Sequence, residues 1–304
     1  MASWSAEDPE SYIQSYEYAI GTTVGGTDIA GWADVSLALG MHHSGLALAN
    51  GSLCYVSVRA TNCAGLQATA TSAPIRAVET PGTIAAALAF ADSTWLALTG
   101  KLVTGVVAPY AWIEEPERYA AVRLETSLPV AEGQKVTTVG QMATPVYTRQ
   151  IVPERVELES AGHLVMPIGM QTVAVGGSAR NSHARGVDGG IGPNNVGTLV
   201  TIWGTVTSAG TGFFYVDDGC GLLDGTGNRG VRVISEELTN PGVGQFVSVT
   251  GLVNASRLLP LGQSIRVLIP RRQTDILPLG TGGPAAGLSA PVPANGGDID
   301  EAAR

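Results

Sequence analysis

Residues 194–221 read NNVGTLVTIWGTVTSAGTGFFYVDDGCG, and three phrases follow: GVRVISEELTN (230–240), PGVGQFVSVTGLVNA (241–255) and SIRVLIPRRQTDILPL (264–279). Apolar and polar residues alternate in short runs, and Gly, Asn, Asp or Pro separates one run from the next. This period-two pattern is typical of half-buried β-strands joined by tight turns. About five such strands fit the segment, which favours a small closed barrel over an open sheet.

The same pattern occurs earlier in the chain, as LALTGKLVTGVVAPYAWIEEPERYAAVRLE (96–125) and VAEGQKVTTVGQ (130–141). In each copy an aromatic strand ends in two acids, a strand containing Val-Arg follows, and a Gly-Gln turn leads into another apolar strand. The paired acids are Glu114 and Glu115 in one copy, and Asp217 and Asp218 in the other. This internal duplication predicts two similar small domains, which we place at 93–165 and 194–279.

Residues 1–78 carry short apolar runs bounded by turn residues, as expected for a β-sandwich. In the run LCYVSVRATN (53–62), Cys54, Val56 and Val58 share one face and are core candidates, whereas Arg59 lies on the opposite, solvent-facing side. We interpret 79–92 as a linker, 166–193 as a Gly-rich connector and 280–304 as an extended tail.

Two family resemblances support this division. Residues 1–78 resemble fibronectin type III-like modules of bacterial secreted and surface proteins, and the matching phrases are SWSAEDPES (3–11), YEYAIGT (16–22), GGTDIAGW (25–32), GLALANG (45–51) and VRATNCAGL (58–66). The two repeats resemble OB-fold-like tandem domains of uncharacterised bacterial proteins, through WIEEPER (112–118), PIGM (167–170), GGIGPNNVG (189–197), WGTVT (203–207) and FYVDDG (214–219). These resemblances imply an all-β chain: an incomplete fibronectin III-like sandwich, two OB-like Greek-key barrels and an extended C-terminal tail.

The fibronectin-like resemblance begins at the second strand of the sandwich, so its first strand is expected to be absent before Met1. The strand around residues 2–6 would then be an open edge with unpaired backbone N–H and C=O groups, and such an edge can accept a strand from elsewhere. The alternative is that residues precede Met1 in the native chain. The predicted assembly residues are Ala2, Ser3, Trp4, Ser5 and Ala6 at this edge, and Leu288, Ser289, Ala290, Pro291 and Val292 in the tail, because Pro is tolerated on edge strands.

The charge balance argues against several partners. Charged residues are only 14% of the chain, and 17 Lys and Arg against 26 Asp and Glu give a net charge of −9. Such a chain is a poor partner for phosphate backbones, so we expect no nucleic acid. No run of about 18 apolar residues predicts a membrane span, and MASWSAEDPE (1–10) has no signal-peptide pattern. We nevertheless expect an extracellular or cell-surface location from the resemblance, with any signal sequence outside this numbering.

No catalytic signature is present: neither G-x-S-x-G, nor a phosphate-binding loop, nor a dinucleotide fingerprint. We therefore predict no enzyme activity, no metal and no cofactor. The residues closest to a calcium pattern match no complete loop template and are also ordinary turn formers: Asp217, Asp218, Asp224 and Asn228. Trp203 and Phe214 are the candidate ligand contacts on the second barrel.

Three cysteines, Cys54, Cys63 and Cys220, leave at least one thiol unpaired within a monomer. On one extended strand Cys54 and Cys63 would be about 30 Å apart, so no bridge between them is expected. Buried free thiols are the expected state.

These features predict a structural protein that self-associates into a filament or tube by exchanging strands or tails between copies. The alternatives are a module that binds glycans or cell-wall polymer, and accessory domains of a longer secreted enzyme.

Overall fold

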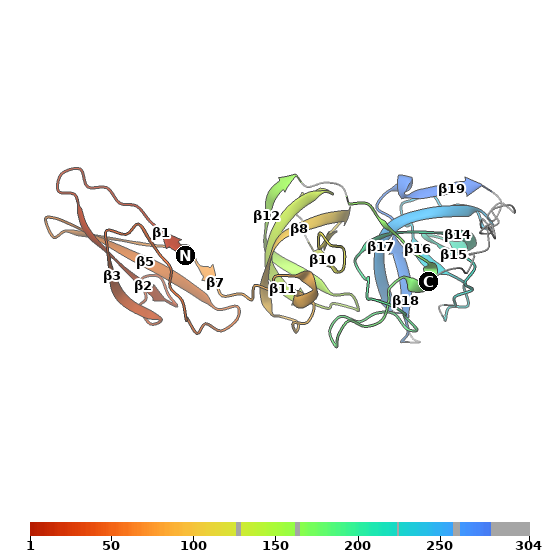
Figure 1. The fold of residues 1–304 in the computed structure, drawn as a ribbon, viewed down its shortest axis with the longest axis horizontal. Coiled ribbons are helices and arrows are strands. Elements are labelled where there is room, and N and C mark those ends of the chain that lie inside the picture. Colours follow the sequence, from red (N-terminus) through yellow and green to blue (C-terminus); the bar gives the residue numbers. More distant parts are fainter. Residues whose placement is uncertain (126–128, 162–164, 224, 258–261, 281–304) are drawn as a thin grey trace, which may run out of the picture. The chain divides into compact units, whose positions relative to one another are not determined.

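The computed structural model describes residues 1–125, 129–161, 165–223, 225–257 and 262–280 (Figure 1). The regular structure is almost entirely β-strand, which confirms the predicted all-β class. The chain divides into two compact units, the first containing 1–164 with 181–184, and the second containing 165–180 with 185–304. No helix among the described residues has the length and apolar character needed to cross a membrane.

The first unit begins with a β-sandwich whose two layers are very unequal. Its large sheet has the order β3-β2-β5-β6, with β7 paired to the start of β5, and its second layer is only β1 paired with β4. The bounds are β1 (Ala2–Ser3), β2 (Ile13–Gly21), β3 (Ala30–Ser36), β4 (Gly40–Met41), β5 (Leu53–Asn62), β6 (Gln67–Thr71) and β7 (Ile75–Arg76).

The alternation along β5 places the side chains as the sequence predicts. Cys54 and Val56 are buried with Ile20 of β2, and Val58 packs against this cluster. Arg59 lies on the other face, where it forms an ion pair with Glu17 at 2.8 Å. The core of the sandwich is therefore confined to the β2–β5 face that β1 and β4 cover.

The first unit continues with a closed five-stranded barrel of order β10-β12-β11-β8-β9. Its strands are β8 (Trp95–Val107), β9 (Tyr110–Glu114), β10 (Ala121–Glu125), β11 (Gln134–Ala143) and β12 (Gln150–Ala161). Alternate residues fill the interior, as in Leu96 and Leu98 of β8 and Ala111 and Ile113 of β9.

A short helix closes the core of this barrel, where the sequence indicates only a linker. Helix α1 (Ile84–Ala87) begins after Thr83, whose hydroxyl accepts a hydrogen bond from the Ala86 N–H at 3.1 Å. Ile84, Ala87 and Leu88 are buried in the barrel core. Within the predicted linker 79–92 this helix has only four residues, which are too few for helical periodicity to show in the sequence.

The second unit contains a second ring with the same pairing scheme. β14 pairs with β15 and β17, β15 pairs with β16, and β18 pairs with β16 in parallel and with β17. β13 adds beside β14 and β19 beside β17. The bounds are β13 (Ile168–Gly169), η1 (Thr172–Ala174), β14 (Leu199–Gly210), β15 (Phe213–Asp217), β16 (Val231–Ile234), β17 (Phe246–Arg257), β18 (Ser264–Ile269), η2 (Gln273–Asp275) and β19 (Ile276–Gly280).

The cysteines differ from expectation. Cys54 is buried, but Cys63 and Cys220 are exposed, so the prediction of buried thiols is wrong for two of the three. Cys63 comes directly after β5, and Cys220 lies in the turn after β15. Turns place small residues at the surface whatever their hydrophobicity.

Candidate functional site

The candidate site is a hollow on the half-covered sheet of the sandwich. Because β1 and β4 have only two residues each, they leave part of the β2–β5 face without a second layer. The hollow has a volume of about 230 Å³. We call it the sandwich hollow; it is lined by Met1, Ala2, Ile20, Met41, His43, Leu46, Leu48, Cys54, Val56, Ile75, Arg76 and Ala77.

The lining of the sandwich hollow is mainly apolar. Most of its side chains are aliphatic or sulfur-containing, and none of those described is acidic. The polar members are Arg76 and His43, and the His43 Nδ1 lies 2.8 Å from the Tyr18 hydroxyl. Burial raises the pKa of the Cys54 thiol, so this side chain behaves as a small apolar group near neutral pH. The surface suits an apolar side chain better than a charged ligand.

The predicted edge residues at the start of the chain lie beside this hollow. Ala2 and Ser3 pair with Met41 and Gly40, and the Trp4 N–H donates to the Leu39 carbonyl at 3.0 Å. In the part of the chain that the structure describes, β1 has a ladder partner on one side only. Ser5 and Ala6 follow β1, and the Ala6 carbonyl accepts a hydrogen bond from the Tyr16 hydroxyl at 3.4 Å. Leu288, Ser289, Ala290, Pro291 and Val292 lie outside the described residues.

The sequence predicts an edge strand over residues 2–6, of which the structure has only Ala2 and Ser3 in a strand, and it does not predict most of the hollow. Leu46 and Leu48 belong to the phrase GLALANG (45–51), whose alternation signalled two apolar side chains on one face. Ile75 gave no such signal, because β7 contains only two residues. Its side chain lines the hollow and is 45% exposed.

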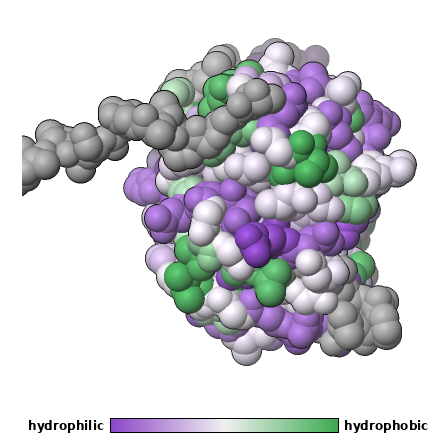
Figure 2. Space-filling model, turned by 90° about the vertical axis from the view of Figure 1, so that its right-hand side faces the viewer, coloured by the Kyte–Doolittle hydropathy of each residue, from purple (hydrophilic) through white to green (hydrophobic). Residues whose placement is uncertain are grey.

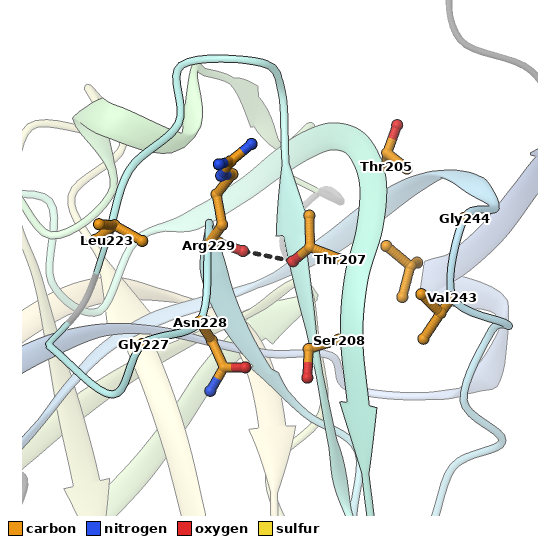
Figure 3. Close-up of a pocket in the computed structure, with 10 residues that line it drawn as sticks. Thr205, Thr207, Ser208, Leu223, Gly227, Asn228, Arg229, Val243 and Gly244 are labelled. Atoms are coloured by element: carbon orange, nitrogen blue, oxygen red, sulfur yellow. Dashed lines mark hydrogen bonds between the residues drawn. The ribbon is translucent and has the colours of Figure 1, made fainter.

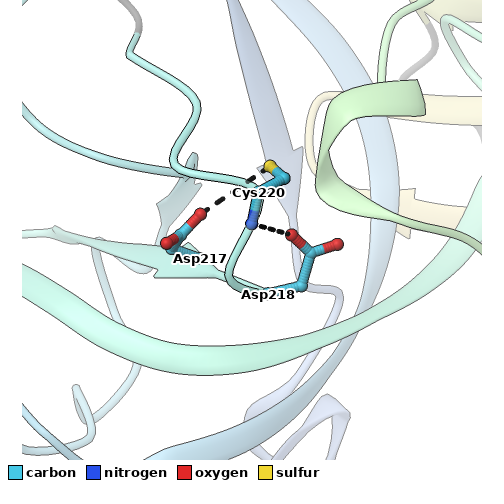
Figure 4. Close-up of side chains that lie close together, drawn as sticks. All are labelled: Asp217, Asp218 and Cys220. Carbon is cyan, nitrogen blue, oxygen red and sulfur yellow. Dashed lines mark hydrogen bonds between the residues drawn. The ribbon is translucent and has the colours of Figure 1, made fainter.

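The paired acids of the second barrel come together with Cys220, and one ligand atom from each of the three side chains lies within 4.8 Å of the others (Figure 4). Asp218 accepts hydrogen bonds from the Thr172 N–H at 2.8 Å and the Thr172 hydroxyl at 2.7 Å, and from the Cys220 N–H at 3.2 Å. Asp217 accepts from the Gly221 N–H at 3.2 Å, and the Cys220 Sγ lies 3.8 Å from its carboxylate. These bonds hold the turn after β15 and the start of η1, and they account for both acids.

The second acid of each pair has the same structural role in the two barrels. Glu115 accepts a hydrogen bond from the Ile84 N–H at the start of α1, as Asp218 does from Thr172 at the start of η1. The N–H groups of a first helical turn lack partners within the helix, so a carboxylate there is stabilising. The second acid of each pair thus anchors a short helical segment to its barrel.

The surroundings of this cluster shift the pKa values of Asp218 and Cys220 in opposite directions. Burial raises the pKa of Asp218, but hydrogen bonds from Thr172 and Cys220 outweigh it, and the pKa lies below its ordinary value. Cys220 is exposed as a whole, but desolvation of its partly covered Sγ raises the pKa of the thiol.

Two further calcium candidates were predicted outside this cluster. The Asn228 amide donates to the Thr226 hydroxyl at 2.9 Å, and Asp224 lies outside the described residues.

The two predicted ligand contacts of the second barrel have different exposures. Phe214 is 0% exposed in the core of the second barrel, so the expectation of a ligand contact there is wrong: its side chain points inward. Trp203 is 44% exposed. A Cβ on Gly169 of β13 would lie 3.3 Å from its ring, so one edge of the indole packs against that strand.

Comparisons of the chain with family models, with curated proteins and with solved structures give no match. On the face drawn in Figure 2, the coloured residues are mostly hydrophilic and the hydrophobic ones form separate spots.

Replacing Asp218 with asparagine is expected to lower the free energy of unfolding of the second unit by about 1 kcal/mol at neutral pH, because the neutral amide lacks the charge that strengthens the bonds from Thr172 and Cys220. Because the folded pKa of Asp218 is lowered, its contribution is complete above the ordinary carboxyl pKa and is lost as the pH falls through the folded value. The difference between wild type and variant should therefore shrink in acid. Urea unfolding at several pH values measures this, with exposed Glu237→Gln as the control; a constant difference would contradict it.

Proposed function

We propose that this protein is a non-catalytic structural protein that acts outside the cell and polymerises, each copy accepting a strand from a neighbour at the sandwich hollow. The observation that carries the proposal is the apolar, acid-free hollow beside a strand that has one ladder partner among the described residues. An apolar groove next to a free strand edge is the geometry that β-strand addition uses, because the edge supplies backbone hydrogen bonds and the groove takes alternate side chains.

The segment Leu288–Val292 of a second copy is the strand we assign to this hollow. Leu288, Ala290 and Val292 alternate with Ser289 and Pro291, so an extended backbone directs three apolar side chains to one face. Pro291 removes one backbone donor, which an edge strand tolerates. The donor carries no charge over these five residues, in keeping with the lining of the hollow.

Donation from the end of one chain to the start of the next is a head-to-tail contact. Such a contact uses two different surfaces, and it produces an open polymer when the rotation between copies does not close a ring.

Replacing Ile75 with glutamate is expected to abolish polymerisation and leave the monomer folded. Ile75 is 45% exposed, so the side chain fits the monomer, but a docked strand would bury its carboxylate against apolar groups. Sedimentation velocity over a wide concentration range, with negative-stain microscopy, measures assembly. Ile191→Glu is the matched control, because Ile191 is 54% exposed and does not line the hollow.

The result that would refute this function is a wild-type chain that stays monomeric at high concentration. Polymers that persist in Ile75→Glu would place the contact elsewhere. Removal of residues 281–304 tests the donor separately: the truncated chain should be monomeric and should bind a peptide of residues 284–296, and a peptide with the same composition in scrambled order should not bind.

A further inference from the structure

A second hollow lies on the outside of the second barrel, with a volume of about 430 Å³ (Figure 3). Three segments form it: residues 205–208 of β14, the loop residues 223 and 227–229, and residues 243–244 before β17. Nothing in the assembly scheme uses these residues. We call this the barrel hollow.

A bulge in β14 and two hydrogen bonds to backbone carbonyls shape the floor of the barrel hollow. β14 has an irregular register between Val206 and Ser208, and a bulge of this kind turns side chains out of the regular ladder. The Val206 carbonyl accepts from the Gly244 N–H at 2.8 Å, which fixes one wall. The Thr207 hydroxyl donates to the Arg229 carbonyl at 2.5 Å, which fixes the loop on the other side. The walls are thus tied to the barrel before any ligand arrives.

The side chains around this floor offer both apolar contact and hydrogen bonds. Leu223 and Val243 are each 64% exposed and lie on opposite sides of Thr207 in Figure 3. Thr205 and Ser208 contribute hydroxyls, and Asn228 contributes an amide. Aliphatic walls above a floor of hydroxyl and amide groups match a sugar ring, which has apolar C–H faces and a rim of hydroxyls.

The charge of the hollow is unusual for this chain. The protein as a whole has a net charge of −9, yet the described residues that line the hollow include Arg229 and no acid. Among the described residues Arg229 has no ion-pair partner. A guanidinium binds a carboxylate through paired hydrogen bonds, so it selects a negatively charged ligand.

We propose that the barrel hollow binds a carboxylated sugar, such as a uronic acid residue of an acidic polysaccharide. The carboxylate pairs with Arg229, the sugar hydroxyls bond to Ser208 and Asn228, and the C–H face lies against Leu223 or Val243. This inference stands apart from polymerisation, because the two hollows share no residue.

The test uses the full-length protein and two probes of one skeleton: trigalacturonic acid and its fully methyl-esterified form, which has no charge. Titration calorimetry should show saturable binding of the acid and weaker binding of the ester. Arg229→Gln should weaken binding of the acid by about tenfold or more, since a charged hydrogen bond contributes roughly 1.5–3 kcal/mol, and should leave ester binding unchanged. Arg257→Gln, which removes another exposed arginine of the second unit, should bind like wild type.

Three outcomes would overturn the inference: no saturable binding of trigalacturonic acid, equal affinity for acid and ester, or an Arg229→Gln variant that binds the acid like wild type. Acetate that competes as well as the trisaccharide would also overturn it, because only the anion would then be recognised. Arg229 is exposed, so the variant is expected to fold, and far-ultraviolet circular dichroism checks this.

Discussion

Replacing Glu115 with alanine is expected to destabilise the first unit by about 3–5 kcal/mol, the usual cost of removing one partner of a buried ion pair. The Glu115 carboxylate lies 2.9 Å from the Lys101 Nζ, and both side chains are buried. The same carboxylate accepts the Ile84 N–H at the start of α1, and Lys101 also donates to the Gly82 carbonyl at 3.0 Å. The variant leaves a buried ammonium without its countercharge and a helix end without its acceptor.

Urea unfolding followed by tryptophan fluorescence measures this effect, because Trp112 is buried in β9 of the same barrel. Glu117→Ala is the matched control; this residue is exposed two positions further on and should change the free energy of unfolding by less than about 0.5 kcal/mol. The double variant Lys101→Met with Glu115→Leu should recover much of the loss, since both charges are gone. A Glu115→Ala variant as stable as its control would show that the pair does not hold the helix to the barrel.

Replacing Gly230 with alanine is expected to destabilise the second unit by about 2–5 kcal/mol, as the sum of two costs. Gly230 has a φ of +102°, a conformation that a side chain rarely adopts. A Cβ at this position would lie 2.2 Å from the Val216 carbonyl oxygen in β15, which is itself part of the sheet. Either the loop before β16 or the end of β15 must move.

Gly227→Ala is the control that separates the two costs. Gly227 has a φ of +84°, but nothing lies within 4 Å of its added Cβ, so only the backbone cost of about 1–2 kcal/mol applies. The two variants, compared by thermal and urea unfolding, should differ clearly. Equal losses would mean that the contact with Val216 relaxes without cost.

The strands could be predicted from sequence because their signal is local. Alternation along 53–62 identified Cys54 and Val56 as core, and burial confirms both. The repeated order of motifs likewise predicted two barrels, which share one pairing scheme.

The features that escaped prediction depend on contacts between distant residues. Four residues of α1 carry no helical period, and its place in the barrel depends on Glu115, 31 positions from Ile84. Phe214 and Phe213 are neighbours of one type, and only the register of β15 decides that Phe214 points inward. The sandwich hollow depends on how little of the β2–β5 face β1 and β4 cover, which no local pattern records.

Trapping the docked strand is the most direct test of polymerisation through the sandwich hollow. Two variants are mixed, both with Cys63→Ser and Cys220→Ser: one keeps Cys54 in the hollow, and the other carries Cys54→Ala and Ala290→Cys in the tail. Because burial raises the pKa of Cys54, a chemical oxidant is added at mildly alkaline pH. Docking of the tail strand in the hollow should give a covalent heterodimer joined through residues 54 and 290, identified by mass spectrometry and absent when the first variant also carries Ile75→Glu. Polymers that form normally and yield no such crosslink would contradict it.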